Sequence, residues 1–490
     1  MIQLPRIIQG GMGVGVSNWR LAQAVSRRGQ LGVVSGTALD QVFVRRLADG
    51  DPGGHMRRAL DAFPFQTIAR RLWNEYFVAG GKPPTEPYPA TPMHQRRELR
   101  KLVELCIAAN FAEVFLAREG HSNPVGINFL EKVQLPHLAS IYGAMLAGVG
   151  YVLMGAGIPL HIPGVLDALV YHQPAEYKLS ISGAVAGQGE DATMRLVPAD
   201  YAEGQLLPLT RPQFLAIVSS HTLAATMLRR ANGTVNGFVV EGPTAGGHNA
   251  PPRGKLQLNS AGEPLYGERD NVDFADFRAL GVPFWLAGGY ASSAKLAEAL
   301  AQGAAGVQVG TAFAFSRESG LREDLKATLV AQAATGAAHV LTDPLASPTG
   351  FPFKAAQLEG TLSDPGTYAH RTRVCDLGFL REPYAREDGS IAYRCSAEPT
   401  TCYQQKGGAP EATAGRKCLC NALLANIGLA QIRPNGGVEL PLVTLGDDVN
   451  IVARFLAPGR NSYSAAEVID ALLVSEPSAQ QLSSAAHQSC

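Results

Sequence analysis

The chain has 490 residues, of which 46% are hydrophobic and 17% are charged, and its 42 basic residues balance 42 acidic ones. This composition supports a large buried core and excludes an intrinsically disordered chain, because disorder requires low hydrophobicity and high net charge. The neutral balance also lacks the electrostatic signature of a protein that binds nucleic acid or an anionic membrane, so we expect neither partner.

The N-terminal sequence, MIQLPRIIQGGMG, lacks the charged segment and long apolar core of a signal peptide, so we expect a cytoplasmic protein. Residues 133–166 contain no Asp, Glu, Lys or Arg and could be mistaken for a membrane span. Glycines and prolines interrupt this run repeatedly, which favours buried segments of a barrel over a transmembrane helix.

Short apolar runs alternate along the chain with amphipathic helical patterns, as is typical of repeated βα units around a parallel sheet. We expect eight strands, at residues 6–9, 31–34, 125–129, 151–154, 215–219, 238–241, 284–287 and 306–309. Eight parallel strands with intervening helices predict an α/β fold of the (β/α)8 TIM barrel type.

Two insertions interrupt the pattern. Residues about 38–123 are charged and helical with a proline-rich loop, and residues about 171–213 include a hairpin near 177–181.

The pattern changes after about residue 355. We therefore assign residues 1–355 to the barrel with its insertions, 356–474 to a C-terminal appendage or lid, and 475–490 to a polar tail. Within the appendage, residues 464–473 are expected to form a helix.

Five of the seven cysteines lie in this appendage, namely Cys375, Cys395, Cys402, Cys418 and Cys420. Their spacing matches none of the common ligand patterns for zinc or iron–sulfur clusters, so we expect no metal. A metal site, buried reduced thiols and a thiol near the cofactor all stay open as interpretations.

A glycine loop follows the first predicted strand and contains Gly10, Gly11, Met12 and Gly13. Without side chains, such a loop lets backbone N–H groups approach a flat or anionic ligand. The dinucleotide-binding fingerprint does not fit, because residue 16 is Val and no ribose-binding acid follows the second strand. A plain tight turn is the alternative. Ser17 or Asn18 is expected to cap the following helix.

The last two predicted strands each run into a loop suited to anions. Residues 284–287 lead into Gly288 and Gly289, and residues 306–309 lead into Gly310 and Thr311. Barrels often bind a phosphate at these two loops, where backbone N–H groups and a helix N-terminus supply positive potential. Two ordinary turns would be the structural alternative.

Polar side chains follow two further strands. His248 lies just after the sixth strand and the glycine pair Gly246–Gly247, where an imidazole can exchange a proton near neutral pH. Asn128 ends the third strand, where its amide could meet the ring edge of a flavin. A solvated histidine and an asparagine-stabilised turn are the alternatives.

These motifs resemble those of the nitronate monooxygenase (2-nitropropane dioxygenase) family, whose FMN-binding barrels also include flavin enoyl-ACP reductases. The matching segments are IIQGGMGVGVS, VGIN, EGPTAGGHN and LAGGYASSAKLAEALAQGAAGVQVGTAF, within residues 1–36 and about 120–320. The resemblance implies an FMN cofactor and a catalytic His248. The cofactor-binding residues expected from the resemblance and these loops are Gly10, Gly11, Met12, Asn128, Glu241, Gly246, Gly247, Gly288, Gly289, Gln308, Val309, Gly310 and Thr311.

One position departs from the family pattern, since Glu241 stands where the family usually has Gln. An ionised carboxylate cannot donate to a flavin carbonyl, and its charge would disfavour a reduced anionic flavin.

Three functional hypotheses follow from the resemblance. The first is an FMN-dependent oxidoreductase that oxidises alkyl nitronates with O2. The second is an NAD(P)H-dependent enoyl-thioester (enoyl-ACP) reductase that serves fatty acid or polyketide synthesis. The third is a flavin-binding partner subunit without turnover. Each of the first two implies a small-molecule substrate, and the oligomeric state stays open.

Overall fold

The computed structural model describes residues 4–183, 192–204 and 206–474, and its centre is a sheet of eight parallel strands. The strands are β1 (Ile7–Gln9), β2 (Gly32–Ser35), β3 (Val125–Leu130), β4 (Tyr151–Gly155), β7 (Gln213–Val218), β8 (Gly237–Glu241), β9 (Phe284–Ala287) and β10 (Gly306–Val309). They pair in the order β1-β10-β9-β8-β7-β4-β3-β2. Leu31 closes the circle, because its carbonyl accepts from Gln9 N at 2.9 Å and its N–H donates to Ile7 O at 3.0 Å. The predicted TIM barrel is confirmed.

Inside the barrel lies a hydrophobic cluster that is separate from the larger core between strands and helices. Its buried members are Ile8, Leu31, Val33, Tyr151, Leu153, Leu215, Val239, Trp285 and Ala287. Trp285 is fully buried, and its indole N–H donates to Pro5 O at 2.7 Å at the end of the barrel where the strands begin. Because side chains fill this end, a ligand can enter only where the strands finish.

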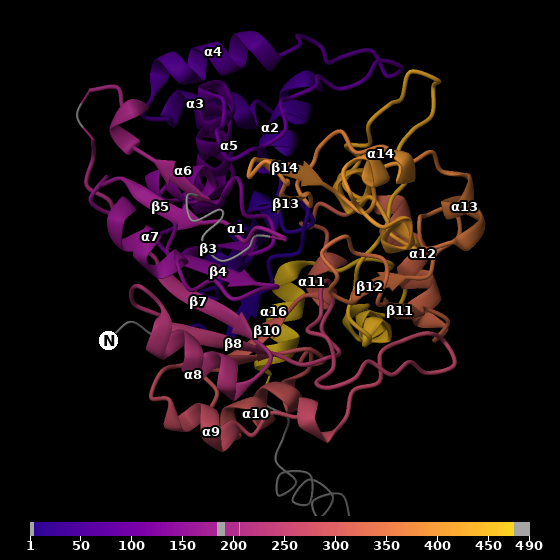
Figure 1. Ribbon diagram of the computed structural model, residues 1–490. Coiled ribbons are helices and arrows are strands. Elements are labelled where there is room, and N and C mark those ends of the chain that lie inside the picture. The colour runs from indigo at the N-terminus through magenta and orange to yellow at the C-terminus, as the bar shows by residue number, and fades with distance from the viewer. Residues whose placement is uncertain (1–3, 184–191, 205, 475–490) are drawn as a thin grey trace, which may run out of the picture.

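A ring of helices surrounds the sheet (Figure 1). Its members are α1 (Trp19–Arg27), α5 (Arg100–Arg118), α6 (His137–Leu146), α7 (Ile162–Leu169), α8 (His221–Arg230), α10 (Ser293–Ala301) and α16 (Ala465–Leu473). The last helix of the first predicted insertion, α5, packs between α1 and α6 and so belongs to this ring. The C-terminal helix α16 packs against α1, α10 and the short α11 (Thr311–Ala314). The final described helix thus returns to the barrel.

The two insertions lie on the outside of the barrel. The first contains α2 (Leu39–Ala48), α3 (His55–Ala62) and α4 (Gln66–Tyr76), followed by the proline-rich loop. In the second, β5 (Ala175–Lys178) pairs antiparallel with β6 (Thr193–Leu196), so the hairpin begins slightly earlier than residues 177–181. A single-turn η1 (Pro198–Asp200) follows it, and η2 (Glu268–Asp270) and α9 (Phe274–Ala279) lie between β8 and β9.

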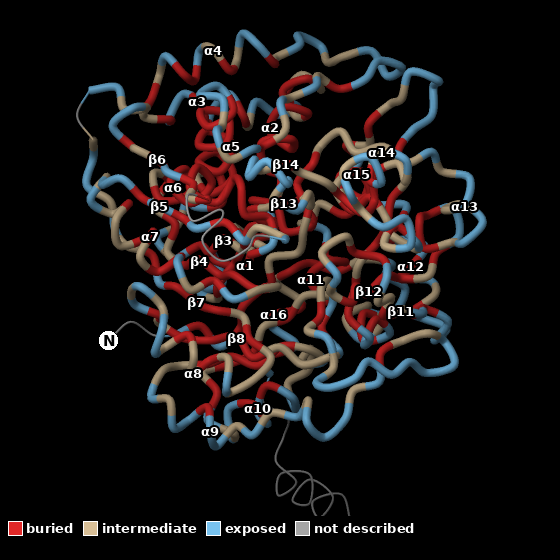
Figure 2. Tube along the Cα trace, in the orientation of Figure 1, coloured by how far each residue is buried: buried red, intermediate tan, exposed pale blue. Residues whose placement is uncertain are grey.

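Residues 323–455, called the C-terminal region below, form several small elements that share the barrel's core; three of them precede residue 357 and so begin before the expected appendage. They are α12 (Glu323–Ala334), β11 (Val340–Asp343), β12 (Phe353–Ala356), α13 (Pro365–His370), β13 (Glu382–Ala385), β14 (Ile391–Arg394), α14 (Thr400–Gln405), η3 (Pro410–Thr413), α15 (Leu419–Ala425) and η4 (Val449–Phe455). Buried residues such as Leu424, Val443 and Leu445 belong to the same hydrophobic cluster as the barrel helices. Figure 2 shows the buried segments running from the strands into this region.

The uncharged run at residues 133–166 forms α6, β4 and the start of α7, all largely buried, as expected for barrel segments. Among the residues that the structure describes, no helix combines the length and the apolar character needed to cross a bilayer. The predicted polar tail, 475–490, lies outside the described residues.

Candidate active site

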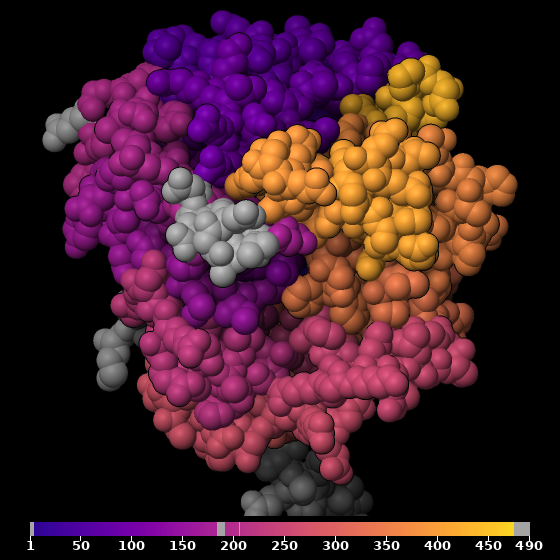
Figure 3. Space-filling model, in the orientation of Figure 1, coloured from indigo at the N-terminus to yellow at the C-terminus, as the bar shows by residue number. Residues whose placement is uncertain are grey.

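A cavity of about 240 Å³ lies where the barrel strands end. Loops after β1, β3, β8, β9 and β10 form one wall, and the C-terminal region forms the other. Figure 3 shows a hollow between the purple part of the surface and the orange C-terminal part. Of the predicted site residues, the following line it: Gly10, Gly11, Met12, Asn128, Glu241, Gly246, Gly247, His248, Gly288, Gly289, Gln308, Gly310 and Thr311. Val309 does not line the cavity; it is buried in β10, and its carbonyl accepts from Gly10 N at 2.9 Å.

The glycine loop after β1 is held rigidly by a buried hydroxyl. Ser17 Oγ donates to Gly10 O and accepts from Met12 N, both at 2.8 Å. Asn18, and not Ser17, caps α1 by accepting from Leu21 N at 3.0 Å. The loop lies so close to β3 that a Cβ on Gly11 would stand 2.2 Å from Asn128 Cβ. Only glycine fits here, and the backbone itself faces the cavity.

Glu241 and Gln308 lie in one row across three neighbouring strands, because both pair in register with Ala287. Burial raises the pKa of Glu241 to about 8, and no charge or hydrogen bond offsets that effect. At neutral pH the side chain is therefore mainly a protonated acid that can donate a hydrogen bond. Gln308 Oε1 is buried without a hydrogen-bond partner, so this row presents one free acceptor and one free donor to a ligand.

The loops after β9 and β10 have the geometry of an anion site. Gly288 and Gly289 both have positive φ, at +96° and +74°, which glycine adopts without strain. Ser292 caps α10 by accepting from Lys295 N at 3.2 Å, so the N-terminus of that helix follows the glycine pair directly. Thr311 begins the short α11 after β10, which is where many barrels place a phosphate.

His248 lines the cavity with its ring packed edge-on against Phe353, at 4.9 Å between centroids. Its Nε2 lies 2.7 Å from the Oγ of Ser347, a fully buried residue that the sequence did not indicate. Burial lowers the pKa of His248 to about 4. The imidazole is therefore neutral at pH 7 and holds one proton that it can share with Ser347 or with a ligand.

The C-terminal segment 444–451 completes the cavity, and nothing in its sequence indicated this role. Thr444 Oγ1 accepts from Gly247 N at 2.9 Å, and Thr311 Oγ1 accepts from Gly446 N at 3.0 Å. A Cβ on Gly246 would stand 2.7 Å from the carbonyl carbon of Leu445, so the two backbones are in contact. Asp448, Ile451, Leu423 and Phe353 also face the cavity.

Residues 209–344 match a family model described as nitronate monooxygenase. This stretch includes Glu241, His248 and the loops after β9 and β10, and the resemblance that the motifs indicate is confirmed there. No curated protein shows a significant match to the chain.

Many solved structures are similar at low sequence identity, and three serve as examples. FabK from Thermotoga maritima has 14% identity and a TM-score of 0.48, with 99% of this chain and 94% of that chain covered. A nitroalkane oxidase from Streptomyces ansochromogenes has 17% identity and a TM-score of 0.42, with 99% and 98% covered. The enoyl reductase domain of MlnA from the macrolactin biosynthesis cluster of Bacillus amyloliquefaciens has 11% identity and a TM-score of 0.46, with 96% and 95% covered. Likenesses this distant carry no argument about substrate.

Proposed function

We propose that the cavity binds FMN and that the protein is an FMN-dependent oxidoreductase of the nitronate monooxygenase type, which oxidises alkyl nitronates with O2. The observation that carries this proposal is the convergence on one cavity of the glycine loop after β1, the phosphate-type loops after β9 and β10, and His248. The family match over residues 209–344 supports it, because the last three of these features lie within the matched stretch.

The residues around the cavity fit a flavin in two respects. Glycines let the loop backbones pack closely around the cavity, since a Cβ at Gly11 would come within 3 Å of Asn128 and one at Gly288 within 3 Å of Thr244. The unpartnered Gln308 Oε1 and the protonated Glu241 supply an acceptor and a donor for the edge of a polar ring. Gly10–Met12 and Asn128 would line the ring, and Gly288, Gly289, Gly310 and Thr311 would hold the phosphate.

Bound FMN would supply the two-electron oxidising chemistry that the amino-acid side chains lack. The protonated Glu241 would take over the donor role of the amide that the family usually has at this position, which removes the objection based on its charge. His248 would orient the substrate anion by donating a hydrogen bond; its lowered pKa makes it a weak base for a neutral nitroalkane, which favours the preformed nitronate as substrate. Ser347 would hold the imidazole in place through its contact with Nε2.

Anaerobic reduction of the FMN-loaded protein tests the reaction class. We expect an alkyl nitronate to bleach the flavin absorbance within seconds, and we expect NADH and NADPH to leave it unchanged. Bleaching by a pyridine nucleotide with turnover of a crotonyl thioester would instead support the enoyl reductase. Bound flavin with no turnover of any substrate would support the non-catalytic subunit.

The His248→Ala variant tests the role of the imidazole. We expect nitronate turnover to fall by about 10²–10³-fold, the usual effect of removing one hydrogen-bond donor to a reacting anion, with FMN binding retained. His221→Ala is the matched control, because His221 starts α8 and its side chain is 38% exposed beside Asp276. Equal turnover in the two variants would remove His248 from the mechanism.

A further inference from the structure

Four of the five clustered cysteines line one small cavity in the C-terminal region. They are Cys375, Cys395, Cys418 and Cys420, and their thiols are free. The fifth, Cys402, lies on α14 and does not line this cavity. The rest of the wall is Pro348, Leu377, Gly378, Leu380, Ala397 and Leu419. Sulfur therefore supplies all of the side-chain ligand atoms at this place.

The four cysteines come from three separate parts of the chain. Cys375 precedes the β13–β14 hairpin, Cys395 directly follows it, and Cys418 and Cys420 flank the first residue of α15. Folding thus brings together thiols that are up to 45 residues apart in sequence, which is why their spacing matched no local motif.

Backbone N–H groups lie near three of the sulfurs. That of Ala397 is near Cys395, that of Asn421 near Cys418, and those of Phe379 and Leu380 near Cys420. Thiolates that bind a metal commonly have such donors around them.

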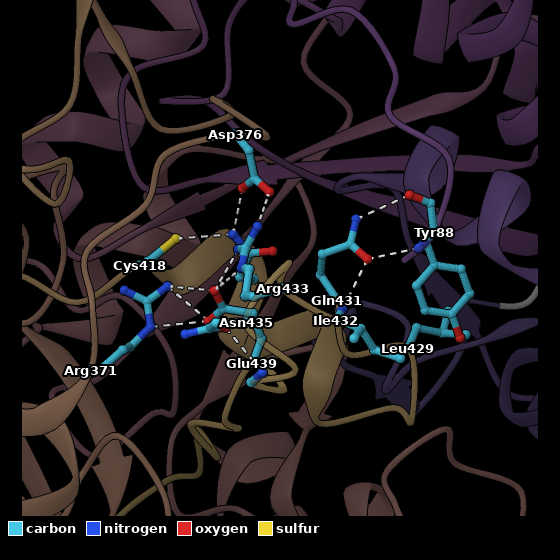
Figure 4. A network of polar contacts seen from close by, with 12 residues as sticks. Tyr88, Arg371, Asp376, Cys418, Leu429, Gln431, Ile432, Arg433, Asn435 and Glu439 are labelled. Carbon is cyan, nitrogen blue, oxygen red and sulfur yellow. Dashed lines mark hydrogen bonds and ion pairs between the residues drawn. The ribbon is translucent and has the colours of Figure 1, made fainter. Parts of the chain in front are cut away.

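Buried polar groups support this ligand set from outside (Figure 4). The side-chain amide of Asn421 donates to Cys418 Sγ at 3.5 Å and to Asp376 Oδ1 at 2.7 Å. Asp376 pairs with Arg433, which also pairs with Glu439. Such a network fixes the amide that faces the sulfur, as outer partners of metal ligands commonly do.

Charged groups of both signs lie near the thiols. The Arg381 guanidinium is near Cys375 and Cys395, that of Arg371 is near Cys418, and the Glu398 and Asp376 carboxylates are near Cys375. Arg371 is also paired with Glu439, so Arg381 is the cation that would offset the charge of thiolate ligands.

A site whose ligands are all sulfur favours metals that bind thiolates well, and the two common cases are a zinc ion and an iron–sulfur cluster. Within the described residues, no group of three or more His, Cys, Asp or Glu side chains is arranged to hold a metal ion directly. A cluster has its own bridging sulfides and spans thiols that are more widely separated than the ligands of one ion. We therefore propose that Cys375, Cys395, Cys418 and Cys420 ligate an iron–sulfur cluster.

The site lies behind the wall of the candidate flavin cavity. Cys420 and Leu423 are three residues apart on α15, so they share one face of the helix within about 5 Å of rise. Leu423 lines the flavin cavity and Cys420 lines the cysteine cavity. One turn of α15 therefore contributes a side chain to each cavity.

The test is metal and sulfide analysis of the full chain purified without oxygen. We expect iron and acid-labile sulfide in equal amounts in the wild-type protein, and a low-temperature EPR signal after dithionite reduction that a flavin radical does not give. Zinc without sulfide, a Cys375–Cys395 disulfide, or protein free of metal would each overturn the proposal.

Matched cysteine variants locate the centre. Cys420→Ser should lower the iron content per chain by about tenfold or more, whereas Cys402→Ser should leave it unchanged. Equal iron content in both variants would also overturn the assignment. The wild-type analysis decides the question by itself if Cys420→Ser fails to fold, and neither measurement depends on whether FMN binds.

Discussion

The carboxyl group of Glu241 should make the stability of the flavin-free protein fall as pH rises. Its pKa moves from an ordinary 4.5 to about 8 because burial disfavours the charged form. Below pH 4.5 the group is protonated in both the folded and unfolded states and has no effect. Between pH 4.5 and 8 it ionises only in the unfolded chain, so the folded state progressively loses relative stability; above 8 the loss is constant.

The size of this loss follows from the change in proton affinity. At 1.36 kcal/mol for each tenfold change, the difference between 4.5 and 8 corresponds to about 5 kcal/mol. This value is an upper limit, because Glu241 is only partly buried and faces a cavity that is large enough for water. A loss of about 2–5 kcal/mol is therefore expected.

This loss of stability can be measured by denaturant unfolding at intervals from pH 4.5 to 9, with the wild-type protein compared with the Glu241→Gln variant. The variant should gain stability relative to the wild type as pH rises, with the gain complete just above pH 8. Glutamine keeps the side chain's size and donor, so the two proteins should have similar stability at the acid end. Parallel stability curves across the range would refute a buried, protonated Glu241.

Two further substitutions test the contacts that close the site. Gly246→Ala should lower the free energy of unfolding by about 1–3 kcal/mol and weaken FMN binding, because its Cβ would overlap the backbone of Leu445. Chemical unfolding measures the first effect and FMN titration the second. Gly242→Ala is the control, because the atom nearest to a Cβ there is 3.6 Å away. Equal behaviour of the two variants would contradict the close backbone contact. Asp447→Ala should lower the free energy of unfolding, measured with heat or denaturant, by about 1–3 kcal/mol. Asp447 forms an ion pair with the buried Lys354 at 2.6 Å, and the substitution leaves that charge without this partner. Asp447→Asn should recover part of the loss, and an unchanged stability in both would show that the pair contributes nothing.

Local patterns predicted the barrel well because the strands are short apolar runs, six of which end at or just before a glycine. Residues 284–287 and 306–309 form β9 and β10 with the predicted bounds. The loop residues of the site could be predicted for the same reason, since every βα loop of a barrel opens at one end. Val309 is the exception, because its side chain points away from the cavity that its neighbours line.

Long-range contacts could not be predicted from local patterns. Ser347 reaches His248 across 99 residues, and Thr444 reaches Gly247 across 197. Neither stands in a motif, and only the return of the C-terminal region to the barrel places them at the site. The cysteines show the same limit, because three distant segments must fold before their sulfurs meet.

Binding of FMN compared with riboflavin tests the central claim most directly. Calorimetric titration of the flavin-free protein should give one FMN site per chain, with an affinity for FMN at least about tenfold above that for riboflavin, or ~1.4 kcal/mol, because the loops after β9 and β10 hold the phosphate. Equal affinities would contradict the phosphate site, and no binding of either flavin would contradict the assignment of the cavity.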